Sequence, residues 1–286
     1  MKGKNLLWLL GLGIVVIVVG GCGDVPIESK IYHYPNWTPD GKIISIKNVI
    51  RETKGMWGNY DITYDKSFIT TISSDGATEA DLFEINDDAY PSEVVCAPDG
   101  KKIGYISHPG YKLSIINYDG TGKYIIPEVS GVSYFDWSPD STRIVYSSDN
   151  RELHVANIDG TNNIIVTSEA SGPVSWRVGN RIAYGFLYLI DQNGSNNQYL
   201  VDGGKPQIMN LGKIMYYSDL NSPGDYKIKS IYQSGTEESI VLNSYSRNTM
   251  KLSFDNSKIV GGALDQQDIV GIWIINIDGT GSKRLR

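Results

Sequence analysis

The sequence is poor in the residues that most often build catalytic and metal centres. Its 286 residues include 2 cysteines and 3 histidines. The histidines, His33, His108 and His154, stand far apart and form no His-x-x-x-His pair, so we predict no metal site. A Gly-x-Ser-x-Gly motif is also missing, which argues against a serine hydrolase. We therefore predict a protein that is not an enzyme, with no catalytic residues and no cofactor.

Basic residues are in deficit as well. The chain has 26 lysines and arginines against 32 aspartates and glutamates, for a formal net charge of −6, and its basic residues form no cluster. Proteins that bind nucleic acid neutralise phosphates with grouped Lys and Arg side chains. The deficit therefore argues against nucleic acid as a partner, and it disfavours broad contact with anionic lipid.

Helical periodicity is absent from every long stretch beyond residue 30, and a repeated phrase takes its place. The phrase reads Trp-Thr-Pro-Asp-Gly at residues 37–41, Cys-Ala-Pro-Asp-Gly at 96–100 and Trp-Ser-Pro-Asp-Ser at 137–141. Proline fixes φ, and aspartate accepts hydrogen bonds from nearby backbone N–H groups. Each phrase is thus typical of a turn before a strand, with its Trp or Cys packed between neighbouring units.

The repeat recurs six times in two independent positions. The strands that follow the turns contain Ile44–Ile46, Ile103–Tyr105, Ile144–Tyr146, Ile182–Tyr184, Ile214–Tyr216 and Ile259–Gly261. A later turn places glycine, usually after Asp or Asn, at Gly76, Gly120, Gly160, Gly194, Gly235 and Gly279. These glycines suit two-residue hairpins and stand 34 to 44 residues apart, a spacing expected of propeller blades. We predict an all-β fold, a six-bladed β-propeller of four-stranded antiparallel blades.

The turn phrase, the Ile-x-Tyr strand and the later Asp-Gly hairpin together resemble the TolB-like, WD-like Pro-Asp repeat β-propeller family of bacterial envelope proteins. The resemblance covers residues 31–286. Its pattern is nearly complete at Trp37, Cys96 and Trp137 and degenerate in the last three repeats. It implies the propeller fold, but propellers of this type serve as scaffolds, sensor domains and enzyme modules, so it implies no single function.

The N-terminus resembles a bacterial lipoprotein signal peptide. Lys2 and Lys4 precede an apolar stretch, Leu6–Val19, which leads into Gly-Gly-Cys at residues 20–22. This stretch is shorter than the ~20 apolar residues that cross a membrane. Small residues before a cysteine allow cleavage and lipid transfer, so we predict acylation of Cys22. The alternative is an uncleaved membrane anchor with an incidental cysteine, and either one places the propeller outside the cytoplasm.

We therefore expect three segments: a lipoprotein signal peptide over residues 1–21, a lipidated N-terminus and short tether over 22–30, and a β-propeller over 31–286. The mature chain would have 24 basic and 32 acidic residues, a net charge of −8. Residues 23–30 extend at most about 25 to 30 Å, which keeps the propeller near the membrane. In a diderm host Gly23 favours the periplasmic side of the outer membrane, and otherwise we expect the cell surface.

The second cysteine, Cys96, has no partner once Cys22 carries lipid, so we expect no disulfide. Cys96 replaces the Trp of the repeat. We predict that it is a small buried hydrophobic residue rather than a nucleophile.

The first blade departs from the repeat. Its second-strand isoleucine stands 59 residues before that of the next blade, against 32 to 45 elsewhere. About 15 residues are therefore inserted, around 47–64. They include Met56, Trp57 and Tyr60, soft and aromatic side chains that suit a contact surface. We predict a partner-binding loop there, and the alternative is a longer hairpin folded back on the propeller rim.

Two functions remain open. The favoured one is a non-enzymatic cell-envelope lipoprotein whose propeller is a protein-interaction scaffold for envelope proteins. The alternative is an extracytoplasmic carbohydrate-binding protein or a polysaccharide-lyase-like propeller enzyme, with a glycan ligand in the channel. Ring closure is also open, since residues 30–34 could complete the last blade.

Overall fold

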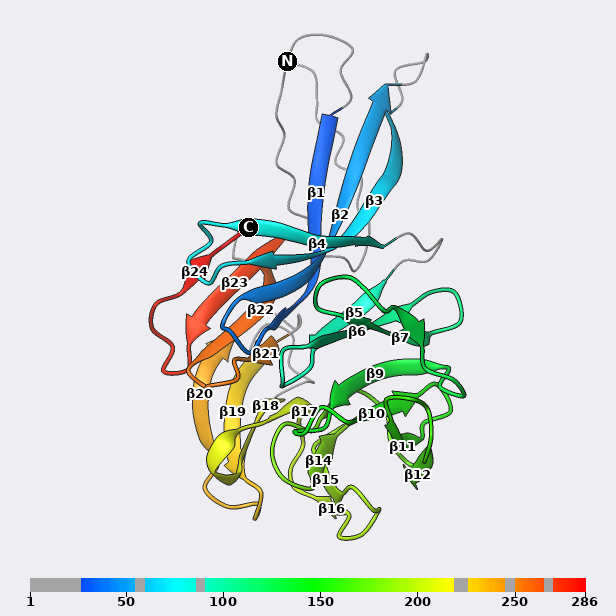
Figure 1. The fold of residues 1–286 in the computed structure, drawn as a ribbon. Coiled ribbons are helices and arrows are strands. Elements are labelled where there is room, and N and C mark those ends of the chain that lie inside the picture. The colour runs from blue at the N-terminus through cyan, green and yellow to red at the C-terminus, as the bar shows by residue number, and fades with distance from the viewer. Residues whose placement is uncertain (1–26, 55–59, 86–90, 219–225, 245–249, 265–269) are drawn as a thin grey trace.

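Six four-stranded antiparallel sheets follow one another around a ring (Figure 1). The computed structural model describes residues 27–54, 60–85, 91–218, 226–244, 250–264 and 270–286. Each sheet uses four consecutive strands in chain order, from an inner strand at the central channel to an outer strand at the rim. The predicted all-β, six-bladed propeller of four-stranded antiparallel blades is thus confirmed.

The first three blades span the N-terminal half of the described chain. Blade 1 consists of β1 (Ile27–Trp37), β2 (Ile43–Lys54), β3 (Tyr60–Ile72) and β4 (Glu79–Ile85). Blade 2 consists of β5 (Ser92–Cys96), β6 (Lys102–Ser107), β7 (Lys112–Asn117) and β8 (Tyr124–Ile125). Blade 3 consists of β9 (Val132–Trp137), β10 (Arg143–Ser148), β11 (Leu153–Asn157) and β12 (Ile164–Thr167).

The last three blades complete the ring. Blade 4 consists of β13 (Val174–Ser175), β14 (Arg181–Tyr184), β15 (Tyr188–Asp191) and β16 (Gln198–Tyr199). Blade 5 consists of β17 (Gly204–Ile208), the 3-10 turn η1 (Asn210–Gly212), β18 (Lys213–Ser218), β19 (Tyr226–Tyr232) and β20 (Ser239–Ser244). Blade 6 consists of β21 (Met250–Leu252), β22 (Lys258–Leu264), β23 (Val270–Asn276) and β24 (Lys283–Arg284).

The glycine turns predicted from the sequence join the third and fourth strands of every blade. Their six glycines have φ between 74° and 87°, a region that glycine adopts without strain. The turns also need glycine for space. A Cβ at Gly160 would meet the carbonyl oxygen of Pro127 at 2.6 Å, and one at Gly194 would meet that of Val166 at 2.9 Å. The hairpins at Gly160 and Gly194 therefore pack closely against the outer part of the preceding blade.

The Pro-Asp turns behave as predicted. Asp140 Oδ1 accepts the hydroxyl of Ser138 at 2.6 Å and the backbone N–H of Thr142 at 3.1 Å, which holds the turn after β9. The tryptophans before the turns, Trp37 and Trp137, are 2% and 1% exposed. They pack between blades, where burial of so large an apolar side chain contributes strongly to stability.

The hydrophobic core is divided into six clusters, one between each pair of neighbouring blades. The cluster between blades 2 and 3, for example, joins Val95 and Ile115 to Phe135 and Trp137. No blade buries both of its faces alone, so the fold is stable only when the ring is complete.

The first and last blades meet without exchanging a strand. In the described sheets, β1 is the inner strand of blade 1 and β24 is the outer strand of blade 6. The expectation that residues 30–34 could complete the last blade is therefore wrong. Strand β1 also begins at Ile27, so the propeller takes in residues that we expected in the tether.

Side chains close this junction between blades 6 and 1. Trp37 Nε1 donates to the carbonyl oxygen of Lys251 at 3.1 Å, and Trp37 packs in one cluster with Val260 and Ile272. Leu285 lies in the same cluster and contacts the hairpin of blade 1 at Gly76. The ring is thus held shut by packing, by hydrogen bonds and by the ion pair of Arg286 with Glu79.

Candidate functional site

The insertion in blade 1 lengthens the strands themselves. Strands β1, β2 and β3 have 11, 12 and 13 residues, whereas the strands of the other blades have 2 to 7. Their outer halves project from the ring as a three-stranded ribbon (Figure 1). Strand β4 pairs with β3 only from Ser67 inward, so it does not cover this ribbon. We refer to residues 27–31, 48–54 and 60–67 as the arm.

Charged side chains fix the base of the arm to the ring. Lys47, 5% exposed, lies 2.5 Å from Asp81 and 3.3 Å from Glu79. Glu79 also accepts hydrogen bonds from Tyr32 Oη at 2.8 Å and from Arg286 Nε at 3.0 Å. Burial raises the pKa of Glu79, but these hydrogen bonds and the nearby cations lower it further, so the pKa lies below its usual value. One ionised carboxylate therefore joins the arm base, the outer strand of blade 1 and the last residue of blade 6.

The sequence-predicted site residues lie mostly outside the described residues. Cys22, Met56 and Trp57 are in segments that the structure does not describe. Tyr60 is the first residue of β3, where its backbone pairs with Lys54, and nothing is described of its side chain. The structure confirms an extended insertion in blade 1, and the partner-binding roles of Met56, Trp57 and Tyr60 stay predictions.

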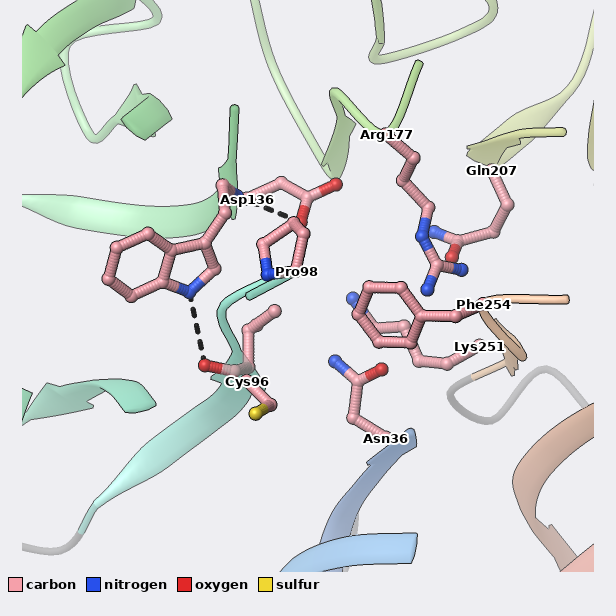
Figure 2. A pocket seen from close by; sticks show the side chains of 10 residues that line it. Asn36, Cys96, Pro98, Asp136, Arg177, Gln207, Lys251 and Phe254 are labelled. Atoms are coloured by element: carbon pink, nitrogen blue, oxygen red, sulfur yellow. Dashed lines mark hydrogen bonds between the residues drawn. The ribbon is translucent and has the colours of Figure 1, made fainter. Parts of the chain in front are cut away.

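A polar cavity occupies the central channel, near the end at which the inner strands finish (Figure 2). Its volume is about 450 Å³, which includes space open to solvent. All six blades contribute to its wall, in chain order through Asn36, Val95, Cys96, Pro98, Asp136, Trp137, Arg177, Gln207, Lys251 and Phe254.

Two of the polar residues on the wall join neighbouring blades. Asn36 donates through Nδ2 to the carbonyl oxygen of Val94 in blade 2, at 3.2 Å. Asp136 accepts the N–H of Trp137 in its own blade and the N–H of Trp176 in blade 4, both at 2.9 Å. Each satisfies backbone groups that a narrow channel would otherwise leave unpaired.

Two cations reach across the channel between blades that are not neighbours. Arg177 of blade 4 donates through Nη1 to the carbonyl oxygen of Leu252 in blade 6, and its guanidinium lies 4.5 Å from the ring centroid of Phe254. Lys251 of blade 6 donates to Glu93 of blade 2 at 2.7 Å. Glu93 lies in a β-bulge of β5 and has φ +47°. Such a bulge changes the direction of a side chain relative to the regular strand.

Burial shifts the ionisation of the charged groups on the cavity wall. It raises the pKa of Asp136, against the effect of Arg177, Lys251 and two backbone N–H groups. Burial also lowers the pKa of Arg177, against the attraction of Asp136. Both shifts have burial as their largest cause, so charged groups on the channel wall are poorly hydrated. A partner of opposite charge therefore stabilises a charged group there more than it would in water.

The remaining chemistry of the described residues is limited. They contain no group of three or more His, Cys, Asp or Glu side chains placed to hold a metal ion.

Cys96 is 1% exposed, and burial, with Asp40 and Asp99, raises the pKa of its free thiol to about 12. Cys96 is therefore buried, as predicted, and its raised pKa disfavours the thiolate form. Across the described residues no helix has the length and apolar character needed to span a bilayer.

Sequence analysis missed the channel residues because each blade contributes only one to three of them. A signal was nevertheless present. The residue before the Trp of the repeat, or before its replacement, is polar in five blades: Asn36, Asp136, Ser175, Gln207 and Lys251. A second signal is Arg177, which stands where other repeats have a small residue such as Thr38 or Ser138.

Comparisons with known proteins agree on the fold. No protein-family model and no curated protein matches the sequence. Among solved structures, the chain is similar to an oligogalacturonate lyase in complex with manganese (TM-score 0.59, 11% identity, covering 96% of this chain and 84% of that one). It is also similar to an oligogalacturonate lyase from Vibrio parahaemolyticus (TM-score 0.55, 12% identity, covering 96% and 85%).

The solved structures that resemble this chain also include TolB from Acinetobacter baumannii, with a TM-score of 0.43, 14% identity and coverage of 88% of this chain and 53% of that one. A likeness at that TM-score supports no functional argument. The identities are all low, so the likeness to the two lyases shows shared architecture and no function. The six blades of this chain are shown by its own sheets.

Proposed function

We propose that this chain is an exported lipoprotein, acylated at Cys22, whose propeller is a non-enzymatic protein-interaction scaffold in the cell envelope. The observation that carries the proposal is the arm. It is the largest departure from the repeat, it leaves the compact ring, and the sequence between β2 and β3 contains Met56 and Trp57. Aromatic and thioether side chains in the segment that joins two projecting strands suit recognition of another protein.

The position of β1 supports a partner at the membrane. Cys22 precedes Ile27 by five residues, a distance of at most about 18 Å in a fully extended chain. Ile27 pairs with Glu52 in the outer half of the arm. An acyl group on Cys22 would therefore hold the arm, rather than the far side of the ring, next to the bilayer. We propose that the partner is an envelope protein bound to that membrane.

Shortening the arm tests the scaffold function. Val49 and Lys66 pair across the β2–β3 hairpin, so Asn-Gly can replace residues 50–65 and close a two-residue turn between them. The ion pairs of Lys47 and Glu79 at the base remain. We expect crosslinked pull-down from native membranes to recover a stoichiometric partner with the full chain and none with the shortened chain, at nearly equal melting temperature.

The matched control is Phe186→Ser, which removes an exposed apolar side chain (59% exposed) from a hairpin of blade 4. It should leave capture unchanged. Equal recovery of the partner by the shortened chain would contradict the proposal. If the full chain captured no protein, and shortening instead weakened its binding to lipid vesicles, the arm would be a membrane-contact element and the scaffold function would be wrong.

A carbohydrate-binding protein or a lyase-like enzyme would instead use the channel, and the polar cavity is the observation that favours this second candidate. It predicts that glycan binding or cleavage survives arm shortening. The scaffold is preferred because the arm is a structural addition to the repeat, whereas every propeller has a channel.

A further inference from the structure

Arg177 has an unusual position for an arginine. Its guanidinium lies on the wall of the channel cavity, and no carboxylate among the described residues is within 4.0 Å of it. Its contacts are the carbonyl oxygen of Leu252 and the face of the Phe254 ring. A guanidinium has five N–H donors in a planar fork, so the single bond to Leu252 leaves up to four donors for a ligand at the cavity wall.

The neighbours of Arg177 add further donors. Lys251 gives one N–H to Glu93 and has two more, because an ammonium carries three. Gln207 donates one N–H of its side-chain amide to the carbonyl oxygen of Pro206, and the second N–H of the same amide can bond a ligand. In Figure 2, the side chains of Arg177, Gln207 and Lys251 approach the cavity from the same side, beside Phe254.

The acidic side chain on the cavity wall is partly satisfied by the backbone. Both oxygens of Asp136 accept backbone N–H groups, from Trp137 and Trp176. The charged lining residues are therefore two cations and one carboxylate whose acceptors are directed at the backbone. Lys251 is paired with Glu93, and Asp136 attracts Arg177, so the two cations are largely balanced in charge. The feature that favours an anion is the set of unused N–H donors of these cations in a poorly hydrated cavity.

We propose that the channel cavity is a binding site for a small anion with planar or tetrahedral oxygens, a carboxylate or a phosphate, held by the fork of Arg177 and supported by Lys251 and Gln207. Arg177 binds the anion as a bidentate partner, and Phe254 keeps the guanidinium plane oriented. The site is independent of the arm, so it goes beyond the scaffold function and does not rest on it.

Calorimetric titration of the whole mature chain tests the site with three probes. Inorganic phosphate represents a free anion, D-glucuronate represents a carboxylate on a sugar, and D-glucose is its uncharged counterpart. We expect saturable binding of phosphate or glucuronate and none of glucose. Binding of glucuronate alone would identify a glycan carboxylate as the source, and binding of phosphate alone would identify a phosphate group.

Variants assign the binding to named residues. Arg177→Met should weaken binding roughly tenfold to a hundredfold, the loss expected for charge-assisted hydrogen bonds. Arg177→Lys, which keeps the charge and loses the fork, should weaken it at least several-fold. Arg181→Met, in β14 and outside the cavity lining, is the matched control and should bind as the parent does.

Arg177 also ties blade 4 to blade 6, so Arg177→Met can fail to fold. Gln207→Leu keeps that tie and should still weaken binding several-fold. The proposal is overturned if neither anion binds the parent chain saturably, or if Gln207→Leu and Arg177→Lys, folded by circular dichroism, both bind as tightly as the parent.

Discussion

Replacing Trp37 with alanine should destabilise the propeller by about 3 to 5 kcal/mol, the usual effect of removing a large aromatic side chain from a packed core. At this chain length that loss corresponds to a fall in melting temperature of roughly 10 °C. Trp37 is 2% exposed and donates to the carbonyl oxygen of Lys251 across the junction between blades 6 and 1. The substitution therefore removes both packing and a hydrogen bond from the only pair of neighbouring blades that no connecting segment links.

Trp137→Ala is the matched control, because Trp137 makes the same hydrogen bond to Val95 at 3.1 Å between blades 2 and 3, which the chain connects. Both variants should lose similar stability. Only Trp37→Ala should open the ring, so hydrogen exchange should accelerate selectively in β1, β22 and β23. A loss below about 1 kcal/mol, or uniform acceleration in both variants, would show that side chains at this junction do not close the ring.

Replacing Cys22 with serine should abolish acylation completely, since a hydroxyl cannot replace the thiol that accepts the lipid. Metabolic labelling with an alkyne fatty acid should mark the parent protein and leave Cys22→Ser unmarked. Intact mass should show a parent chain that begins at residue 22 and carries lipid, and a serine variant that keeps residues 1–21.

Cys96→Ser is the control for this experiment. Cys96 is buried and its pKa is raised to about 12, so it offers no reactive thiolate. Its serine variant should be labelled as fully as the parent. A parent chain that is unlabelled and retains Met1 would instead establish the uncleaved membrane anchor, and Cys22 would have no part in attachment.

The blades could be predicted from the sequence because their signals are local. A glycine such as Gly120 needs positive φ within one hairpin, and a tryptophan such as Trp137 recurs at a fixed place before its turn. Ring closure is not local. Residues 30–34 could pair with an edge strand of blade 1 or with one of blade 6, and the local sequence does not say which. In the structure they belong to β1, which pairs with β2 of blade 1 along most of its length.

The candidate site was likewise predicted only in part, because the sequence indicated the arm but not the channel cavity. The length of the insertion predicted a contact element, but not the ion pair that Lys47 of β2 makes with Glu79 of β4 at its base, because the two residues are far apart in the sequence. The channel cavity was not predicted at all. Arg177 and Lys251 are 74 residues apart in the chain, and only the circular arrangement of blades places both on one cavity wall.

The two proposed binding sites are in different parts of the molecule. The arm is a ribbon with ion pairs at its base, next to the proposed lipid anchor, whereas the cavity is a small space lined by residues of all six blades. A protein partner on the arm and a small anion in the channel can therefore bind at the same time. Loss of either activity by its own variants should leave the other unchanged.

The most direct test of the scaffold function is site-specific photocrosslinking in living cells. A photoreactive phenylalanine analogue would replace Glu28 on the arm (side chain 61% exposed) or Ile240 on β20 (60% exposed). We predict that the arm position gives one discrete crosslinked envelope protein and that Ile240 gives none. Discrete crosslinks from Ile240 alone, or none from either position, would contradict the assignment of the arm as the partner-binding surface.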